Sequence, residues 1–171
     1  MSEATADLTA TDESVMVEET RVGRFQMEAR VGATAFLVDE PVKVGGLGTG
    51  PNPYDLLSAA LGSCTAMTVR LYAEHKAWPL EKVRVRVAHR RGALQARDSF
   101  AREIELEGPL DDTQRARLLE IAERCPVHLT LERGSDVATK LLPAKARAAG
   151  EGATEGEHMK HMEEACAAPI G

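Results

Sequence analysis

The chain has 171 residues, of which 43% are hydrophobic and 28% are charged, so it has enough apolar residues to build a packed core. Its net charge of −6 disfavours a general role in polyphosphate binding, and an aromatic content of 4% disfavours base stacking on single-stranded nucleic acid. No apolar run approaches the roughly 18 residues of a membrane helix, and residues 1–12 lack a signal sequence. We therefore expect a cytoplasmic protein that binds neither nucleic acid nor membrane.

The two ends of the chain differ in composition from its middle. Residues 1–14 are small, polar and acidic, and residues 144–171 contain a stretch rich in Gly, Ala and Glu followed by a short acidic ending. Segments with little apolar surface and high charge do not bury enough area to fold. We expect a disordered acidic arm over 1–14, one ordered domain over 15–143 and an acidic, flexible tail over 144–171.

The ordered part is expected to begin with two strands, 16–28 and 29–38, joined as a hairpin near Gly23 or Gly32. A loop follows over 39–51, where closely spaced glycines leave no regular element.

The strongest helix signal starts at Asn52, which suits the N-cap, and at Pro53, which suits the first helical position. The helix is expected to run to about residue 76, with one apolar stripe formed by Leu57, Leu61, Cys64, Thr68 and Leu71. Gly62 lies inside it, where a glycine costs about 1 kcal/mol relative to alanine. Such a cost suggests that another part of the chain approaches closely there.

The second half of the domain predicts a further hairpin and a further helix. Residues 82–87 alternate valine with Lys or Arg, and residues 99–107 repeat this pattern, so the apolar side chains face a core. A helix is expected to begin at Asp111 and to end near Cys125, because the proline that follows disfavours helical geometry before it. Residues 137–142 predict a last strand. The order of elements predicts an α+β fold rather than a Rossmann alternation.

Three cysteines, Cys64, Cys125 and Cys166, do not suggest a disulfide scaffold in a chain without a signal sequence. Cys64 lies on an apolar stripe, where a buried structural cysteine is the simplest interpretation, and a thiolate there needs a cation brought in by folding. If a short helix begins at Pro126, Cys125 occupies its N-cap, which favours a thiolate. His128 is either a surface or boundary histidine or a group that polarises a neighbouring thiol.

Residues 50–68, GPNPYDLLSAALGSCTAMT, resemble the OsmC/Ohr family of osmotically inducible and organic-hydroperoxide-resistance proteins. The Cys-Pro-Val-His stretch at 125–128 is similar to the second cysteine motif of that family. The resemblance covers roughly residues 20–142 and is greatest to the OsmC-like branch whose central helix starts with Pro-Tyr-Asp-Leu-Leu. It implies an intertwined α+β homodimer with its sites at the subunit interface. In each subunit, N-terminal strands, a long central helix carrying Cys64, and a second strand group with a helix leading to Cys125 are implied.

The resemblance also implies a thiol peroxidase that acts on small organic hydroperoxides. Cys64 is then the thiolate that attacks the peroxide and becomes a sulfenic acid. Cys125 resolves this intermediate as a disulfide, which a dithiol reductant of the lipoyl or thioredoxin type reduces. No metal and no organic cofactor is implied.

The chain departs from the family ten residues before Cys64, where the peroxidases carry a Glu that positions an Arg. Tyr54 stands in that place, and its neighbour Asp55 lies half a turn away from Cys64 on a continuous helix, where it helps to cap the helix start. No cation of the N-terminal half matches a family motif; the candidates are Arg21, Arg24, Arg30 and Lys43. These departures favour, as an alternative, a non-catalytic OsmC-like module that binds a small molecule.

A third possibility concerns the tail, where His158, His161 and Cys166 together suggest a metal ligand set. Their spacing matches no closed zinc pattern, so a solvated acidic tail is the simpler interpretation.

Overall fold

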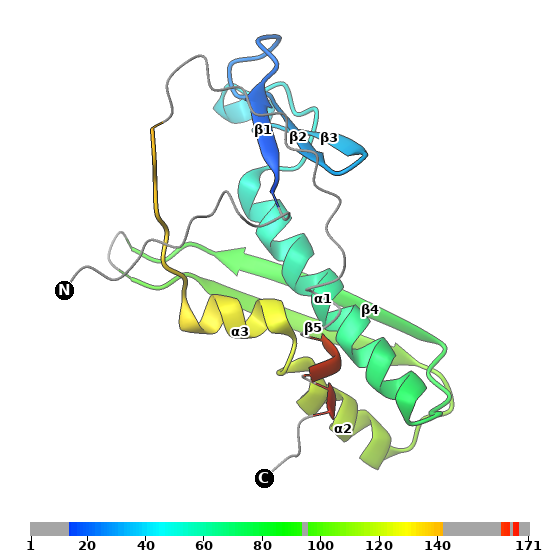
Figure 1. Cartoon of the computed structure of the whole chain (residues 1–171). Helices are drawn as coiled ribbons and strands as arrows, with labels where there is room; N and C mark the ends of the chain where they lie inside the picture. Colours follow the sequence, from blue (N-terminus) through cyan, green and yellow to red (C-terminus); the bar gives the residue numbers. More distant parts are fainter. Residues whose placement is uncertain (1–13, 94–95, 142–161, 165, 168–171) are drawn as a thin grey trace, which may run out of the picture. The chain divides into compact units, whose positions relative to one another are not determined.

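The computed structural model of the chain describes residues 14–93, 96–141, 162–164 and 166–167. These residues form two compact units (Figure 1). The first contains residues 14–53 and 136–141, and the second contains 54–93, 96–135, 162–164 and 166–167. The expected arm, apart from residue 14, and most of the expected tail lie outside the described residues.

The first unit contains a three-stranded antiparallel sheet in the order β1-β2-β3. Its strands are β1 (Met16–Glu19), β2 (Met27–Val31) and β3 (Thr34–Val38). The expected two-strand hairpin is therefore wrong, because the chain turns at both candidate glycines rather than at one of them. Gly32 has a φ of 54°, in the left-handed region that glycine adopts without steric cost. Ala29 pairs with Val17 on one side and Phe36 on the other, and it is buried.

The loop after β3 folds around the buried carboxylate of Asp39 and contains one short 3-10 turn, η2 (Val42–Val44). Asp39 accepts four hydrogen bonds, from the N–H groups of Glu40 (2.8 Å), Leu47 (3.0 Å) and Thr49 (3.2 Å) and from the Thr49 hydroxyl (2.9 Å). A Cβ atom at Gly46 would lie 1.8 Å from the Glu40 carbonyl oxygen, so the loop closes only because this residue has no side chain. The glycines thus allow a tight polar loop.

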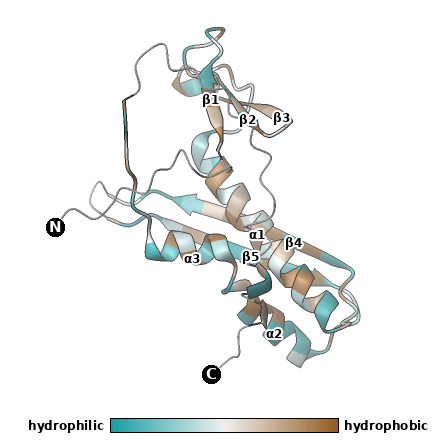
Figure 2. Ribbon diagram, in the orientation of Figure 1, coloured by the Kyte–Doolittle hydropathy of each residue, from teal (hydrophilic) through white to brown (hydrophobic). Residues whose placement is uncertain are grey.

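The second unit is built on α1 (Pro53–His75), which starts where the sequence predicts and carries apolar residues along much of its length (Figure 2). Its buried residues are Leu61, Gly62, Cys64, Thr65, Thr68, Val69, Tyr72 and Ala73. The expected stripe is wrong at Leu57, which is 43% exposed, and Leu71 is only half-buried. The buried face follows the 3.6-residue period and includes Thr65 and Val69 beside the expected positions.

Two antiparallel strands, β4 (Lys82–Arg90) and β5 (Ser99–Glu107), form the expected hairpin over their full length. Residues on one face are half-buried and those on the other are exposed, which confirms the predicted alternation. A Cβ atom at Gly62 would lie 3.3 Å from Cγ2 of Val87, so α1 does approach β4 closely at this glycine.

The remaining helices are α2 (Asp112–Ala122) and α3 (Pro126–Arg133). Asp111 caps α2 through a capping box with Gln114, and Cys125 is the N-cap of α3 with proline at the first helical position. The two helices and the α+β fold class confirm the sequence-based expectations.

The predicted last strand is wrong over residues 137–141, the part of it that the structure describes. Residues 134–141 contain no strand, and Val137 and Leu141 are 88% and 96% exposed. A strand needs a neighbour for its N–H and C=O groups, and no strand among the described residues pairs with this segment. In the tail, by contrast, Met162 is buried and Cys166 packs against the core of the second unit.

That core contains eight buried residues from α1, α2 and the segments flanking the hairpin, namely Val69, Tyr72, Ala73, Leu80, Leu110, Leu118, Ile121 and Ala122. By length and hydropathy alone, α1 is long and apolar enough to cross a membrane. This differs from the expectation that no apolar run approaches the length of a membrane helix. The most apolar stretch of α1 is 44% buried within the protein, and the core helix of a soluble protein passes the same test.

Candidate active site

The centre of the site is a buried pair of cysteines, Cys64 and Cys125. Their Sγ atoms lie 2.8 Å apart, and neither is in a disulfide. Cys64 comes from the middle of α1 and is 2% exposed, whereas Cys125 comes from the N-cap of α3 and is fully buried. Two thiols at this separation are placed to form a disulfide with little backbone movement.

The first turn of α3 supplies a backbone donor to each sulfur. The N–H of Val127 donates to Cys64 Sγ at 3.4 Å, and the N–H of His128 donates to Cys125 Sγ at 3.5 Å. Free N–H groups at a helix N-terminus favour a negative charge. A thiolate on either cysteine is therefore stabilised by α3.

The pKa values of the two thiols are pushed apart by their contact. The hydrogen bond with Cys64 is the main factor that lowers the pKa of Cys125, to about 6, against burial, which raises it. The same contact with Cys125, followed by burial, raises the pKa of Cys64. Because the two groups titrate together, the first proton lost belongs to the pair, and the thiol that keeps its proton donates to the other sulfur.

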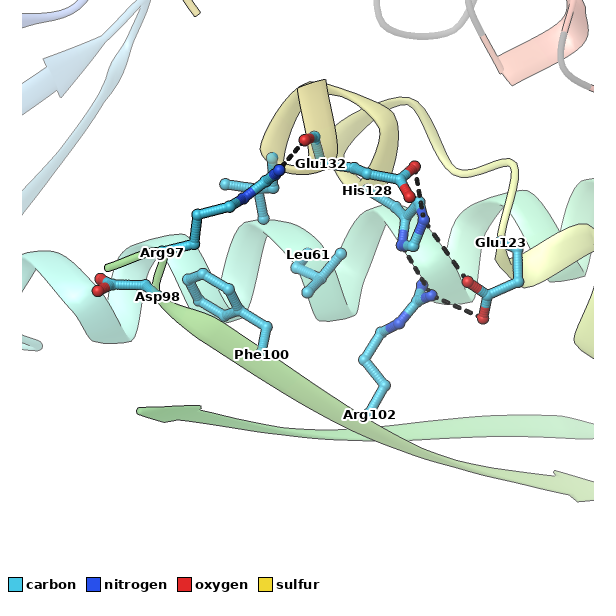
Figure 3. Close-up of a pocket in the computed structure, with 9 residues that line it drawn as sticks. Leu61, Arg97, Asp98, Phe100, Arg102, Glu123, His128 and Glu132 are labelled. Atoms are coloured by element: carbon cyan, nitrogen blue, oxygen red, sulfur yellow. Dashed lines mark hydrogen bonds and ion pairs between the residues drawn. The ribbon is translucent and has the colours of Figure 1, made fainter. Parts of the chain in front are cut away.

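A cavity of about 320 Å³ lies beside the pair, lined by Leu61, Arg97, Asp98, Phe100, Arg102, Glu123, His128, Leu131 and Glu132 (Figure 3). Neither cysteine lines the cavity, but Leu61 belongs to the same buried cluster as the two cysteines, and Phe100 and Leu131 pack against that cluster. Charged groups form the rest of the lining, which suits a small molecule with an apolar body and a polar end.

Arg102 is a cation that folding brings to this site, and sequence reasoning missed it. Its side chain is 9% exposed, and Figure 3 shows it converging with Glu123 and His128 at one side of the cavity. The signal was present in the alternation of β5, where Arg102 falls on the half-buried face between Phe100 and Ile104. A charged residue at an inward position of a strand needs buried partners.

Tyr54 takes part in an aromatic stack. The centroid of its ring lies 4.4 Å from that of His89, with an interplanar angle of 9°. The His89 ring centroid lies 4.8 Å from that of Phe100 in the cavity wall. Nε2 of His89 is 2.9 Å from Oδ2 of Asp98, and this hydrogen bond lowers the pKa of Asp98. Like Arg102, His89 occupies an inward position of a strand and was not identified from the sequence.

The remaining predicted site residues do not bring a side chain to the sulfur atoms in any contact described for them. Asp55 is exposed in the first turn of α1. The His128 imidazole faces Arg102 and Glu123, so it is the backbone of His128 that contacts a cysteine. Arg24 lies over the ring of Phe25 in the first unit, and Arg30 pairs there with Glu28. Arg21 and Lys43 also belong to the first unit.

The predicted metal ligands in the tail, His158 and His161, lie outside the described residues. Within the part of the chain that the structure describes, no group of three or more His, Cys, Asp or Glu residues is arranged to hold a metal ion. Cys166 is half-buried, its Sγ lies 3.8 Å from the Thr68 carbonyl oxygen, and burial raises its pKa. It is thus a packed thiol rather than an exposed one.

The second unit thus combines an α+β fold with a buried, hydrogen-bonded pair of thiols at a helix N-terminus. The family model for OsmC-like protein matches residues 46–140, more than half of the chain, and the chain belongs to this family. Names of its structural neighbours refer to osmotic stress and to organic hydroperoxide resistance. The resemblance found in the sequence is therefore confirmed.

Solved structures share the fold at low sequence identity. A Psychrobacter arcticus protein whose name refers to osmotic stress induction and detoxification is 24% identical, with a TM-score of 0.60 over 68% of this chain and 85% of that one. An OsmC-like protein from Mycoplasma pneumoniae is 20% identical (TM-score 0.58; 72% and 89% covered). An organic hydroperoxide resistance protein from Legionella pneumophila is 22% identical (TM-score 0.54; 70% and 88% covered). A search of curated protein sequences gave no match.

Proposed function

We propose that this protein reduces organic hydroperoxides with the thiols of Cys64 and Cys125. The observation that carries the proposal is the 2.8 Å separation of two buried sulfurs that each accept a backbone N–H from α3. Membership of the OsmC-like family supports it. Two adjacent thiols suit this chemistry because a sulfenic acid is rescued from further oxidation only when a second thiol reacts with it first.

The reaction balances with one peroxide and one dithiol reductant. A cysteine thiolate attacks the terminal oxygen of the hydroperoxide, the O–O bond breaks, and the alkoxide takes up a proton and leaves as the alcohol. The second thiol attacks the sulfenic sulfur, water leaves, and a disulfide forms. A dithiol of the lipoyl or thioredoxin type then reduces this disulfide by thiol–disulfide exchange. Both cysteine thiols are restored, and the reductant becomes a disulfide.

In the proposed order Cys64 attacks and Cys125 resolves. The resting charge is favoured on Cys125, so attack requires that the charge moves to Cys64 as the proton moves the other way between the two sulfurs. The Val127 N–H and the Thr68 hydroxyl are hydrogen-bond donors that favour a thiolate on Cys64. The cavity wall of Leu61 and Phe100 would hold the organic part of the peroxide next to this sulfur.

Peroxide consumption with a dithiol reductant tests the proposal in the wild type, Cys64→Ser and Cys125→Ser. Under cumene hydroperoxide we expect turnover in the wild type and none in Cys64→Ser. Without reductant, Cys125→Ser should consume one equivalent of peroxide and leave a sulfenic acid on Cys64 that dimedone traps. Equal, negligible rates in all three proteins would contradict the peroxidase proposal, and dimedone labelling of Cys125 in Cys64→Ser would reverse the order.

A second candidate function is a non-catalytic module that binds a small molecule. Tyr54, which stands where the peroxidases carry a Glu, is stacked on His89, and this favours the alternative. A binding module predicts ligand-dependent thermal stabilisation that persists in a Cys64→Ser/Cys125→Ser double variant, together with no peroxide turnover in the wild type.

We also propose that the protein is a cytoplasmic homodimer. Apolar side chains that stay exposed in one chain support a second copy as their cover, notably Leu57 (43%) and Met67 (50%) on α1 and Val137 (88%). Burying such residues contributes about 1.5–3 kcal/mol each. Light scattering after size-exclusion chromatography is expected to give twice the chain mass of 18.4 kDa. A monomeric mass would contradict the dimer.

A further inference from the structure

We propose that Arg102 is a positioning residue for the cysteine pair, which acts through the Thr65 hydroxyl and holds together the three helical segments around the two sulfurs. The inference rests on the proposed redox role of the pair. It is tested on the thiols themselves, without peroxide, so its failure is distinguishable from failure of the peroxidase proposal.

Arg102 reaches three elements from β5 with its two terminal nitrogens. Nη1 donates to Thr65 Oγ1 of α1 at 2.8 Å and to the Ala122 carbonyl oxygen at the end of α2 at 3.0 Å. Nη2 lies 3.0 Å from Glu123 Oε1 and 3.0 Å from Nδ1 of His128 in α3. The planar fork of a guanidinium fits such a set of acceptors, whereas a lysine ammonium would not hold them all in one geometry.

The Thr65 hydroxyl links this guanidinium to the sulfurs. A hydroxyl has one proton and two lone pairs, and Arg102 occupies a lone pair of Oγ1. The proton is then available to two acceptors, the Leu61 carbonyl oxygen at 2.7 Å and Cys125, whose pKa a hydrogen bond from Thr65 lowers. A charged sulfur is the stronger acceptor, so the hydroxyl turns to it when Cys125 loses its proton.

The contact with His128 fixes the first turn of α3. Because a guanidinium donates and does not accept, Nδ1 of His128 accepts this hydrogen bond and the neutral ring carries its proton on Nε2. His128 lies in the same turn as the two N–H groups that face the sulfurs. By holding the side chain, Arg102 also holds the backbone donors of the pair in place.

A purely structural clamp would make the same contacts, so the test must report on the charge of the sulfurs. The rate of iodoacetamide alkylation is measured against pH in the reduced protein, with absorbance at 240 nm as a second record of the thiolate. The variants are Arg102→Met, Thr65→Val and the double variant. Thr65→Ser keeps the hydroxyl, and Arg86→Met removes an exposed arginine from the outer face of the same hairpin.

Arg102→Met and Thr65→Val are each expected to raise the midpoint of the thiolate titration by about one pH unit, equivalent to about tenfold less thiolate below the midpoint. Thr65→Ser and Arg86→Met should titrate like the wild type. Since Arg102 acts through Thr65, the double variant should shift no further than Arg102→Met alone.

Three outcomes would overturn the proposal. They are an unchanged midpoint in Arg102→Met or in Thr65→Val, an additive shift in the double variant, and a shift in Thr65→Ser equal to that in Thr65→Val. If Arg102→Met does not fold, Arg102→Lys replaces it and Thr65→Val still decides, because that change keeps the shape of the side chain. If the variants show these shifts but the wild type has no peroxide turnover, the peroxidase proposal is refuted and the positioning role stands.

Discussion

The two units each bury a charged side chain, and they satisfy it in opposite ways. In the first unit the Asp39 carboxylate receives all four of its hydrogen bonds from one loop, from residues no more than ten positions away. In the second unit the Arg102 guanidinium bonds to residues 20–37 positions away on three separate helices or helix ends. One charge organises a local loop, and the other connects distant segments.

This difference has a thermodynamic consequence. Burial raises the pKa of Asp39, but the hydrogen bonds from Thr49, Glu40 and Leu47 outweigh it, so the pKa lies below its usual value of 3.8. Asp39 is therefore a fixed structural anion. The partners of Arg102 are the His128 imidazole, the Thr65 hydroxyl, the Ala122 carbonyl and the carboxylate of Glu123, which is 64% exposed. The position of this cation therefore depends on the packing of several elements rather than on one loop.

The strongest way to break the local arrangement is Gly46→Ala. The new Cβ would lie 1.8 Å from the Glu40 carbonyl oxygen and 2.9 Å from Oδ1 of Asp39, so the loop could not close around the carboxylate. We expect a loss of about 3 kcal/mol or more in the free energy of unfolding. Gly45→Ala in the same loop is the control, because its Cβ would lie 3.6 Å from Cε2 of Phe25, an ordinary contact, and its left-handed backbone (φ 96°, ψ 11°) costs only about 1–2 kcal/mol. Equal losses in urea unfolding would contradict the close contact.

Asp39→Asn removes the anion and keeps its shape. At pH 7 we expect the thermal midpoint to fall by several degrees, because the amide replaces one acceptor oxygen with a donor that faces other donors. Since the folded pKa of Asp39 is lowered, its stabilisation is fully present above the unfolded value of 3.8 and is lost as the pH falls through the folded value. The two proteins should converge in calorimetry at strongly acidic pH. A constant gap down to pH 2 would contradict this assignment.

Glu123→Gln tests whether the Arg102 clamp depends on its ion pair. Glu123 is 64% exposed, so its pair with Arg102 should contribute less than about 1 kcal/mol, and the neutral amide oxygen still accepts from the guanidinium. Glu120→Gln is the matched control, since Glu120 pairs with Arg117 at 2.7 Å and is 60% exposed. Chemical denaturation should give similar small losses for both. A loss several times larger in Glu123→Gln would mean that the ion pair, rather than the neutral acceptors, holds Arg102.

The smallest effect is expected for Gly62→Ala, where α1 contacts β4 beside the cysteine pair. Alanine improves helix propensity by about 1 kcal/mol, but its Cβ would lie 3.3 Å from Cγ2 of Val87, which must yield slightly. The net change should stay within about 0.5 kcal/mol. Ser63→Ala, on the exposed side of the same turn, reports propensity without crowding and should be stabilising. A Gly62→Ala gain larger than that of Ser63→Ala would show that the contact carries no strain.

Much of the second unit is predictable from the sequence because its signals are local. Asn52 and Pro53 mark the start of α1, Asp111 marks the start of α2, and Pro126 places Cys125 at the N-cap of α3. The failures have physical causes as well. Residues 137–141 have the composition of a strand, yet a strand forms only where a neighbour completes its hydrogen bonds, and none among the described residues does.

The sequence by itself determined the helix starts, the face of each hairpin strand and the two cysteines with their family motifs, because each depends on residues within a few positions of one another. Only the tertiary structure decided that the sulfurs of Cys64 and Cys125 meet at 2.8 Å and that Arg102 bonds to Thr65, the chain neighbour of Cys64. The alternation of β5 placed Arg102 on the inner face. Which side chains it meets there depended on how α1 and α3 pack against the hairpin, and no local pattern encodes that packing.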